Sequence, residues 1–117
     1  MIKNICKILC SIILLSNIAL AQEDYFTEVR AEHILVKTAA EAKQIKKAVD
    51  EGGSFEYYAR NYSMCPSASR NGDLGYFGKG QMVPEFERAA FATPVGEVSK
   101  PVYTQFGWHL IKVIDKR

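Results

Sequence analysis

Two stretches near the C-terminus of the sequence predict a β-hairpin. Residues 102–104 and 108–114 are rich in β-branched, aromatic and aliphatic side chains, and the short connection at residues 105–107 ends in a glycine. A further strand is predicted at residues 30–37, which have the same character. The chain shows no regular alternation of strand and helix. We therefore expect an α+β domain on a small, mainly antiparallel sheet.

Helical patterns occupy the region between the first strand and the hairpin. After Thr38, which has the character of an N-cap, alanine, isoleucine and valine recur at helical spacing as far as the glycine pair at residues 52–53. A short strand is predicted at residues 73–77. The expected helical segments are the one after Thr38, a shorter one from Ser54 to about Asn61, one turn at residues 66–69, and one from residues 83–84 to residues 93–94.

Residues 1–21 have the pattern of a secretory signal. Lys3 and Lys7 precede an apolar run over residues 8–20, and residues 19–21 form the small-x-small pattern that a signal peptidase cuts. An uncleaved anchor is the alternative, but the run is shorter than the roughly 20 residues of a membrane-spanning helix. We therefore expect cleavage, export and no stable membrane span afterwards, with the periplasm favoured over secretion into the medium.

Without the signal, the chain is expected to form one small domain with no net charge. Residues 22–29 are predicted to be an extended leader to a single folded domain at residues 30–117. The sequence has fifteen Lys and Arg against thirteen Asp and Glu, a formal net charge of +2, and the signal contains two of the lysines and no acid. A neutral domain gives no electrostatic argument for nucleic-acid binding.

Four residues that can take part in chemistry lie on or beside the predicted strands: His33, Cys65, Thr104 and His109. Cys65 is the sole cysteine after the signal, so no internal disulfide is expected. Two imidazoles and a hydroxyl can share one hydrogen-bond network, although an ordinary core role is the simpler interpretation of each histidine alone. Other enzyme classes are less well supported. No hydrolase signature surrounds Cys65, a zinc site would have three ligands without a short-range pair, and no C-x-x-C motif is present.

Five segments occur in the order that is typical of one enzyme family. They are HILVK at residues 33–37, YSMCPS at 62–67, GDLG at 72–75, GQMVPEF at 80–86 and QFGWHLIKV at 105–113. In these segments the chain resembles the parvulin family of peptidyl-prolyl cis/trans isomerases over residues 30–117. It is most similar to single-domain bacterial parvulins and to the catalytic domains of periplasmic folding factors. The resemblance implies the parvulin (FKBP-like) fold, a mainly antiparallel four-stranded sheet flanked by about four helices.

The resemblance also implies a role for individual residues. His33 and His109 would form a pair at the floor of the site, with Thr104 bonded to them and Cys65 beside the bound peptide bond. The substrate-binding residues would be Met82 and Phe86 around the proline ring, Leu74 and Phe91 as further walls, and Gln81 and Phe106 at the rim. For Met82, Phe86 and Phe91, periodicity alone favours core packing on a helix face about equally.

The implied activity is non-covalent rotation of Xaa-Pro bonds in unfolded, exported polypeptides, by a monomer that needs no metal or other cofactor. A neutral Cys65 would set the polarity around the turning carbonyl. Phosphate-directed parvulins carry a basic cluster after the first strand, whereas here Lys37 stands alone before Thr38, so no phosphate requirement is expected. The alternative is a parvulin-fold holdase that binds unfolded chains without catalysis.

Overall fold

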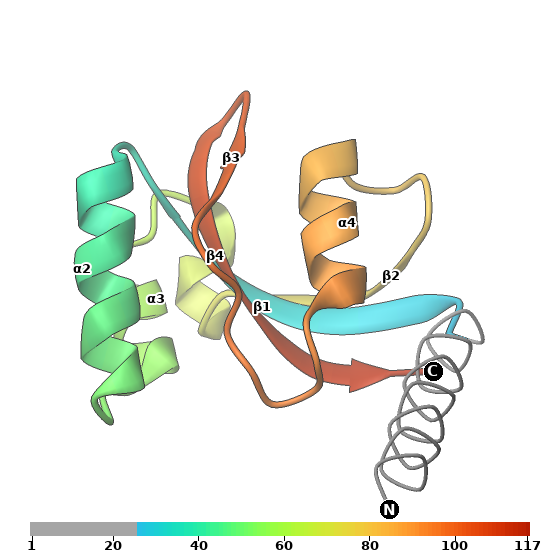
Figure 1. Ribbon diagram of the computed structural model, residues 1–117, viewed down its shortest axis with the longest axis horizontal. Coiled ribbons are helices and arrows are strands. Elements are labelled where there is room, and N and C mark those ends of the chain that lie inside the picture. The colour runs from blue at the N-terminus through green and yellow to red at the C-terminus, as the bar shows by residue number, and fades with distance from the viewer. Residues whose placement is uncertain (1–25) are drawn as a thin grey trace, which may run out of the picture.

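A single antiparallel sheet of four strands forms the centre of the domain in the computed structural model, which describes residues 26–117 (Figure 1). The strand order is β2-β1-β4-β3. The strands are β1 (Glu28–Val36), β2 (Asp73–Gly78), β3 (Val102–Thr104) and β4 (Gly107–Lys116). The helices of the described part are α2 (Ala39–Asp50), α3 (Phe55–Tyr62), the 3-10 helix η1 (Pro66–Arg70) and α4 (Pro84–Ala92). The predicted α+β class and antiparallel sheet are confirmed.

The helices begin where the sequence places capping residues. Thr38 Oγ1 accepts a hydrogen bond from the backbone N–H of Glu41 at 3.2 Å and donates to the Glu41 carboxylate at 3.1 Å, so Thr38 is the N-cap of α2. Ser54 Oγ accepts from the backbone N–H of Tyr57 at the start of α3. Pro84 occupies the first turn of α4, where its missing N–H costs no hydrogen bond.

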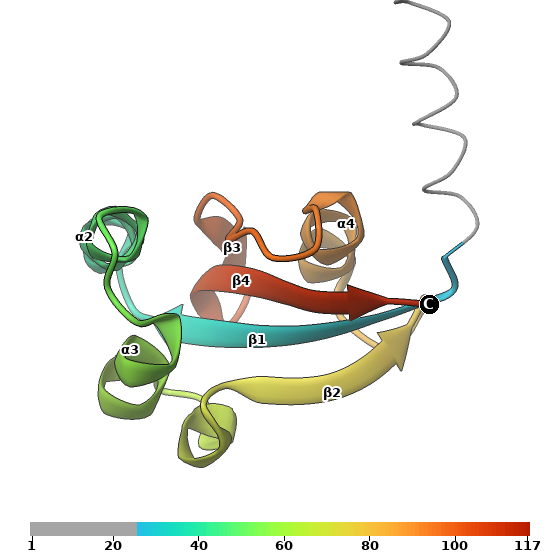
Figure 2. The same cartoon turned by 90° about the horizontal axis from the view of Figure 1, so that it is seen from below.

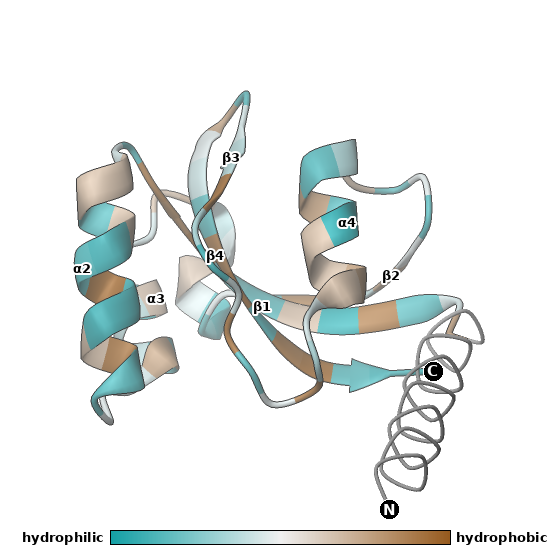
Figure 3. Ribbon diagram, viewed as in Figure 1, coloured by the Kyte–Doolittle hydropathy of each residue, from teal (hydrophilic) through white to brown (hydrophobic). Residues whose placement is uncertain are grey.

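The two faces of the sheet carry separate apolar clusters because side chains alternate along a strand. On one face, Val29 and Ala31 of β1 and Ile111 and Val113 of β4 pack with Phe77 of β2 and with Phe86 and Ala90 of α4. On the other face, residues of the same two strands pack with α2 and α3, and this cluster comprises Ile34, Val36, Ala42, Ile45, Phe55, Ala59 and Leu110. Figure 3 shows apolar stretches along β1 and β4.

The helices divide the surface around the sheet into two regions. Figures 1 and 2 show α2 and α4 on either side of the β3–β4 hairpin, while α3 lies near α2 in both views. The hairpin therefore lies between α4 and the pair formed by α2 and α3.

The observed boundaries differ from the expected ones at the outer ends of two strands. β1 begins at Glu28, inside the predicted leader, and β4 runs from Gly107 to Lys116. The added residues of β1 pair with β2, since Glu28 lies opposite Gly78 and Val29 opposite Phe77. The predicted signal at residues 1–21 lies outside the described residues. Over residues 26–117, none of the helices combines the length and apolar character needed to span a membrane.

Candidate active site

Two histidines lie next to each other on the face of the sheet that α4 covers. The antiparallel register sets His33 opposite Ile111 and Leu35 opposite His109, so the two histidines are diagonal neighbours on adjacent strands. Their Nδ1 atoms are 3.1 Å apart, and the rings are stacked with 18° between their planes. The structure therefore brings together two residues that are 76 positions apart in the sequence.

The Thr104 hydroxyl extends the pair into a network of three side chains. Thr104 Oγ1 lies 2.7 Å from His109 Nε2, and the backbone N–H of Phe106 donates to the same oxygen at 3.1 Å. A neutral imidazole has one N–H and one bare nitrogen, so one proton lies between the two Nδ1 atoms and either ring can carry it. The network ends at His33 Nε2, which is buried without a hydrogen-bond partner among the described residues.

Burial keeps both imidazoles neutral at physiological pH. His33 and His109 are almost fully buried. Burial lowers the pKa of each to about 4, and for His33 the neighbouring His109 adds to the effect. Phe86 of α4 packs against both rings edge to face, with centroids 5.5 Å and 5.3 Å away. The floor of the site is therefore a polar but uncharged network beneath an aromatic ring.

A mainly apolar cavity of about 330 Å³ lies beside the histidines. Its walls come from β2, from the segment before α4 and from the first turn of α4. The lining residues are His33, Cys65, Leu74, Gln81, Met82, Val83, Phe86, Phe106 and His109. Cavities of a few hundred Å³ with a few polar groups suit a small apolar group, such as a side chain of a bound peptide.

Cys65 reaches the cavity from the segment between α3 and η1. Ser67 Oγ donates to Cys65 Sγ at 3.1 Å, and Ser63 Oγ accepts from the backbone N–H groups of Cys65 and Leu35 at 3.3 Å and 3.0 Å. Within the described part of the chain, no hydrogen bond joins Cys65 to either histidine. Ser67 is therefore the partner of the thiol and Ser63 the partner of the Cys65 backbone, and neither is an imidazole base.

Eight of the ten site residues expected from the sequence line this cavity, whereas Thr104, which bonds to His109 behind it, and Phe91 do not. Phe91 is five positions after Phe86 on α4, which rotates it well over 100° around the helix axis. It packs instead against Phe77, with ring centroids 6.4 Å apart, and against the cluster between α4 and the sheet. Its expected role as a wall of the proline pocket is thus not supported by its position.

Three residues near the cavity were not singled out by the sequence. Val83 lines it, and Ser63 and Ser67 hold the cysteine segment. The spacing Ser-x-Cys-x-Ser is the one signal that could have indicated the two serines, since hydroxyls two positions away can bond to a cysteine segment locally. Over residues 26–117 the His, Cys, Asp and Glu side chains form no cluster of three arranged to hold a metal ion.

The comparisons with known proteins agree with this geometry. The family model described as the PPIC-type PPIase domain matches residues 23–115. The fold is thus that of a peptidyl-prolyl cis/trans isomerase domain. The chain belongs to the PPIC-type family, the parvulins.

Named relatives and solved structures support the assignment. The chain is 53% identical over 95 residues to the foldase protein PrsA of Geobacillus kaustophilus. The alignment covers 80% of this chain and 34% of that protein. The crystal structure of PrsA from Bacillus anthracis has a TM-score of 0.77 at 45% identity and covers 82% of this chain and 45% of that one. The solution structure of the parvulin of Nitrosopumilus maritimus has a TM-score of 0.70 at 43% identity, over 76% and 97% of the two chains. The chain spans about a third of the length of the PrsA relatives it matches.

Proposed function

We propose that this chain accelerates rotation about Xaa-Pro bonds in unfolded, exported polypeptides, acting as a monomer and without covalent chemistry. The observation that carries the proposal is the apolar cavity with neutral, hydrogen-bonded histidines at its floor. Longer relatives of this chain are named foldases. That name supports the proposal that unfolded chains are the substrates.

The chemistry of the reaction suits a site of this kind. Rotation about an amide breaks its resonance, with a barrier of about 18–20 kcal/mol, and no bond needs to be broken. An enzyme can lower this barrier by binding the twisted amide better than the planar forms. The twisted amide has lost its polarised resonance form, so an apolar, dehydrated cavity favours it over the planar ground states. Met82 and Phe86 hold the proline ring in this scheme while the preceding carbonyl turns.

The polar residues act by fixing the environment of the amide rather than by moving protons. With a pKa of about 4, His33 and His109 are neutral near pH 7 and carry no proton in excess to donate. Within the described part of the chain, the Cys65 thiol has a serine partner and no imidazole base, which supports a role as a neutral sulfur beside the turning carbonyl.

Among residues 26–117, the cavity offers no cation for a phosphate group. None of the side chains that line it is a lysine or an arginine, and both histidines are neutral. A phosphate before the proline would therefore lose hydration without gaining a charged partner. We infer that apolar residues are preferred at that position.

Exchange spectroscopy on a short Xaa-Pro peptide tests the proposal, with Phe86→Ala and Phe91→Ala as a matched pair on one helix. Phe86→Ala should lower kcat/KM about 30-fold, since losing a buried aromatic wall costs about 2 kcal/mol. Phe91→Ala should leave kcat/KM within a few-fold of the wild-type value. Urea unfolding checks that both variants are folded. Binding of the peptide without faster exchange would instead identify a holdase.

Export is tested separately from activity. The sequence pattern at residues 1–21 supports cleavage before Gln22. The N-terminus and compartment of the protein expressed from its full sequence in a bacterial host can be measured directly. A product that retains Met1 in the cytoplasmic fraction would contradict the proposal.

A further inference from the structure

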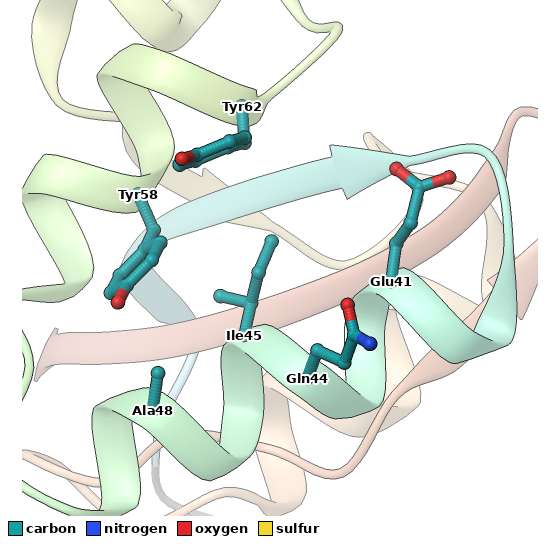
Figure 4. A pocket seen from close by; sticks show the side chains of 6 residues that line it. All are labelled: Glu41, Gln44, Ile45, Ala48, Tyr58 and Tyr62. Atoms are coloured by element: carbon teal, nitrogen blue, oxygen red, sulfur yellow. The ribbon is translucent and has the colours of Figure 1, made fainter.

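A second cavity, of about 400 Å³, lies between α2 and α3, away from the histidines. Its lining residues are Glu41, Gln44, Ile45 and Ala48 of α2 and Tyr58 and Tyr62 of α3. Figure 4 shows the two tyrosine rings on α3 facing Ile45 and Ala48 across the cavity, with Gln44 and Glu41 further toward the N-terminal end of α2. The proposed isomerase mechanism uses none of these residues.

The chemistry of the lining suits a basic side chain. Tyr58 and Tyr62 are stacked with centroids 5.8 Å apart and 28° between their planes, and both aromatic side chains line the cavity. Glu41 is the one charged residue among the six, and it carries a negative charge. Aromatic faces and a carboxylate both attract an ammonium or guanidinium group, while Ile45 and Ala48 offer apolar surface for its aliphatic stem.

Exposed side chains connect this cavity with the catalytic one. Tyr62 lines the second cavity and Cys65 lines the first, and only three Cα–Cα steps separate them, so their Cα atoms are at most about 11 Å apart. Tyr62 and Met64, which lie along this path, expose 55% and 53% of their surface. An extended peptide rises about 3.3 Å per residue, so three or four residues span the Cα–Cα distance between Tyr62 and Cys65, where the two cavities come nearest along the chain.

We propose that the cavity between α2 and α3 is a subsite for an arginine or lysine side chain of the same polypeptide whose proline occupies the catalytic cavity. The inference rests on the proposed function, because it assigns part of the substrate of that reaction. The basic residue lies about three to five positions from the proline, as the bridging distance requires. The subsite gives the enzyme a preference for client segments in which a basic residue and a proline are close together.

A peptide series measures this preference. In one set arginine is placed two to six positions before or after a single proline, and in the matched set glutamine replaces it. The best arginine peptide should exceed its glutamine partner about 3- to 10-fold in kcat/KM, as a partly exposed cation–π contact and one ion pair would provide. Equal values for arginine and glutamine at every position would overturn the proposal.

Two charge variants of α2 locate the effect. Glu41→Gln should reduce the arginine preference to the part that the aromatic faces supply, and it keeps a side-chain oxygen that can accept from the Thr38 hydroxyl. Glu51→Gln removes the same charge at the other end of the helix, outside the cavity, and should leave the preference intact. A preference that is undiminished in Glu41→Gln, or that falls equally in both variants, contradicts the subsite.

A binding measurement separates this inference from the proposed function. Titration with N-acetyl-arginine methylamide should shift the NMR signals of Tyr58, Tyr62 and Ile45, whereas the glutamine analogue should not. If no proline peptide were accelerated but these shifts occurred, the isomerase proposal would fail and the basic pocket would stand. If isomerase activity were present without such shifts, the pocket assignment alone would fail.

Discussion

Replacing Gly72 with alanine tests whether a close backbone contact positions the active-site histidine. Gly72 precedes β2 and has φ of +82°, a conformation that alanine adopts at a cost. Its carbonyl accepts a hydrogen bond from the backbone N–H of His33 at 2.9 Å. A Cβ atom at position 72 would lie 2.3 Å from the carbonyl oxygen of His33 and 3.2 Å from the Cβ of Ala59. The backbone on one side or the other must therefore move.

Gly75 provides the matched control. It lies three positions later with φ of +69°, and a Cβ atom there would have nothing within 4 Å. Gly75→Ala thus carries the conformational cost alone, about 1 kcal/mol after the gain from a less flexible unfolded chain is subtracted. Gly72→Ala adds about 1–3 kcal/mol of overpacking and about 1–2 kcal/mol for weakening the bond to His33, a total of about 3–6 kcal/mol.

Urea unfolding of the two variants measures the difference directly. Gly72→Ala should lie at least about 2 kcal/mol below Gly75→Ala in free energy of unfolding, which is a large part of the 5–15 kcal/mol typical of a domain. The NMR signals of His33 should also change in Gly72→Ala and stay unchanged in Gly75→Ala. Equal stability of the two variants would refute the reasoning, because the contact with His33 is the main structural difference between the two positions.

Two predictions concern pH. Because burial lowers the pKa of His33 and His109 to about 4, the isomerisation rate should stay constant from about pH 6 to 8 and change only as the rings charge at lower pH; a step near pH 6.5 would show an ordinary, solvated histidine. Burial and the nearby Glu56 raise the pKa of Glu32 to about 8. The folded state therefore holds the Glu32 proton more tightly than the unfolded chain does. The stability that this proton contributes is fully present below about pH 4.5 and is lost as pH rises through about 8. Urea titrations should show this decline in the wild type and a flatter profile in Glu32→Gln; identical profiles would mean that Glu32 does not hold the proton.

The antiparallel sheet and the helices could be predicted because their signals are local. Thr38 and Ser54 cap α2 and α3 in the structure as their side chains indicate in the sequence. The alternation of apolar residues along β1 and β4 predicts two faces, although it does not say what covers each one. Glu28 gave no such signal, because its place in β1 comes from pairing with Gly78 of a distant strand.

For the site residues as well, local sequence patterns predict some features and only the packing of the domain determines the others. His33 and His109 could be paired only through a family resemblance, since no local spacing relates two residues on different strands. Phe86 and Phe91 look alike in the sequence, yet Phe86 packs on both histidines whereas Phe91 packs on Phe77. The direction in which α4 crosses the sheet decides between them, and that direction is a property of the packed domain.

The sequence by itself determined the family, the order of the elements and the residue types of the catalytic cavity, because these follow from short motifs and from the periods of helix and strand. Only the tertiary structure decided which side chains share a space. The contact between the histidine rings and the tyrosine-lined cavity both arise where separate segments of the chain pack together. Packing is decided by shape and burial over the whole domain, and no local pattern of residues records it.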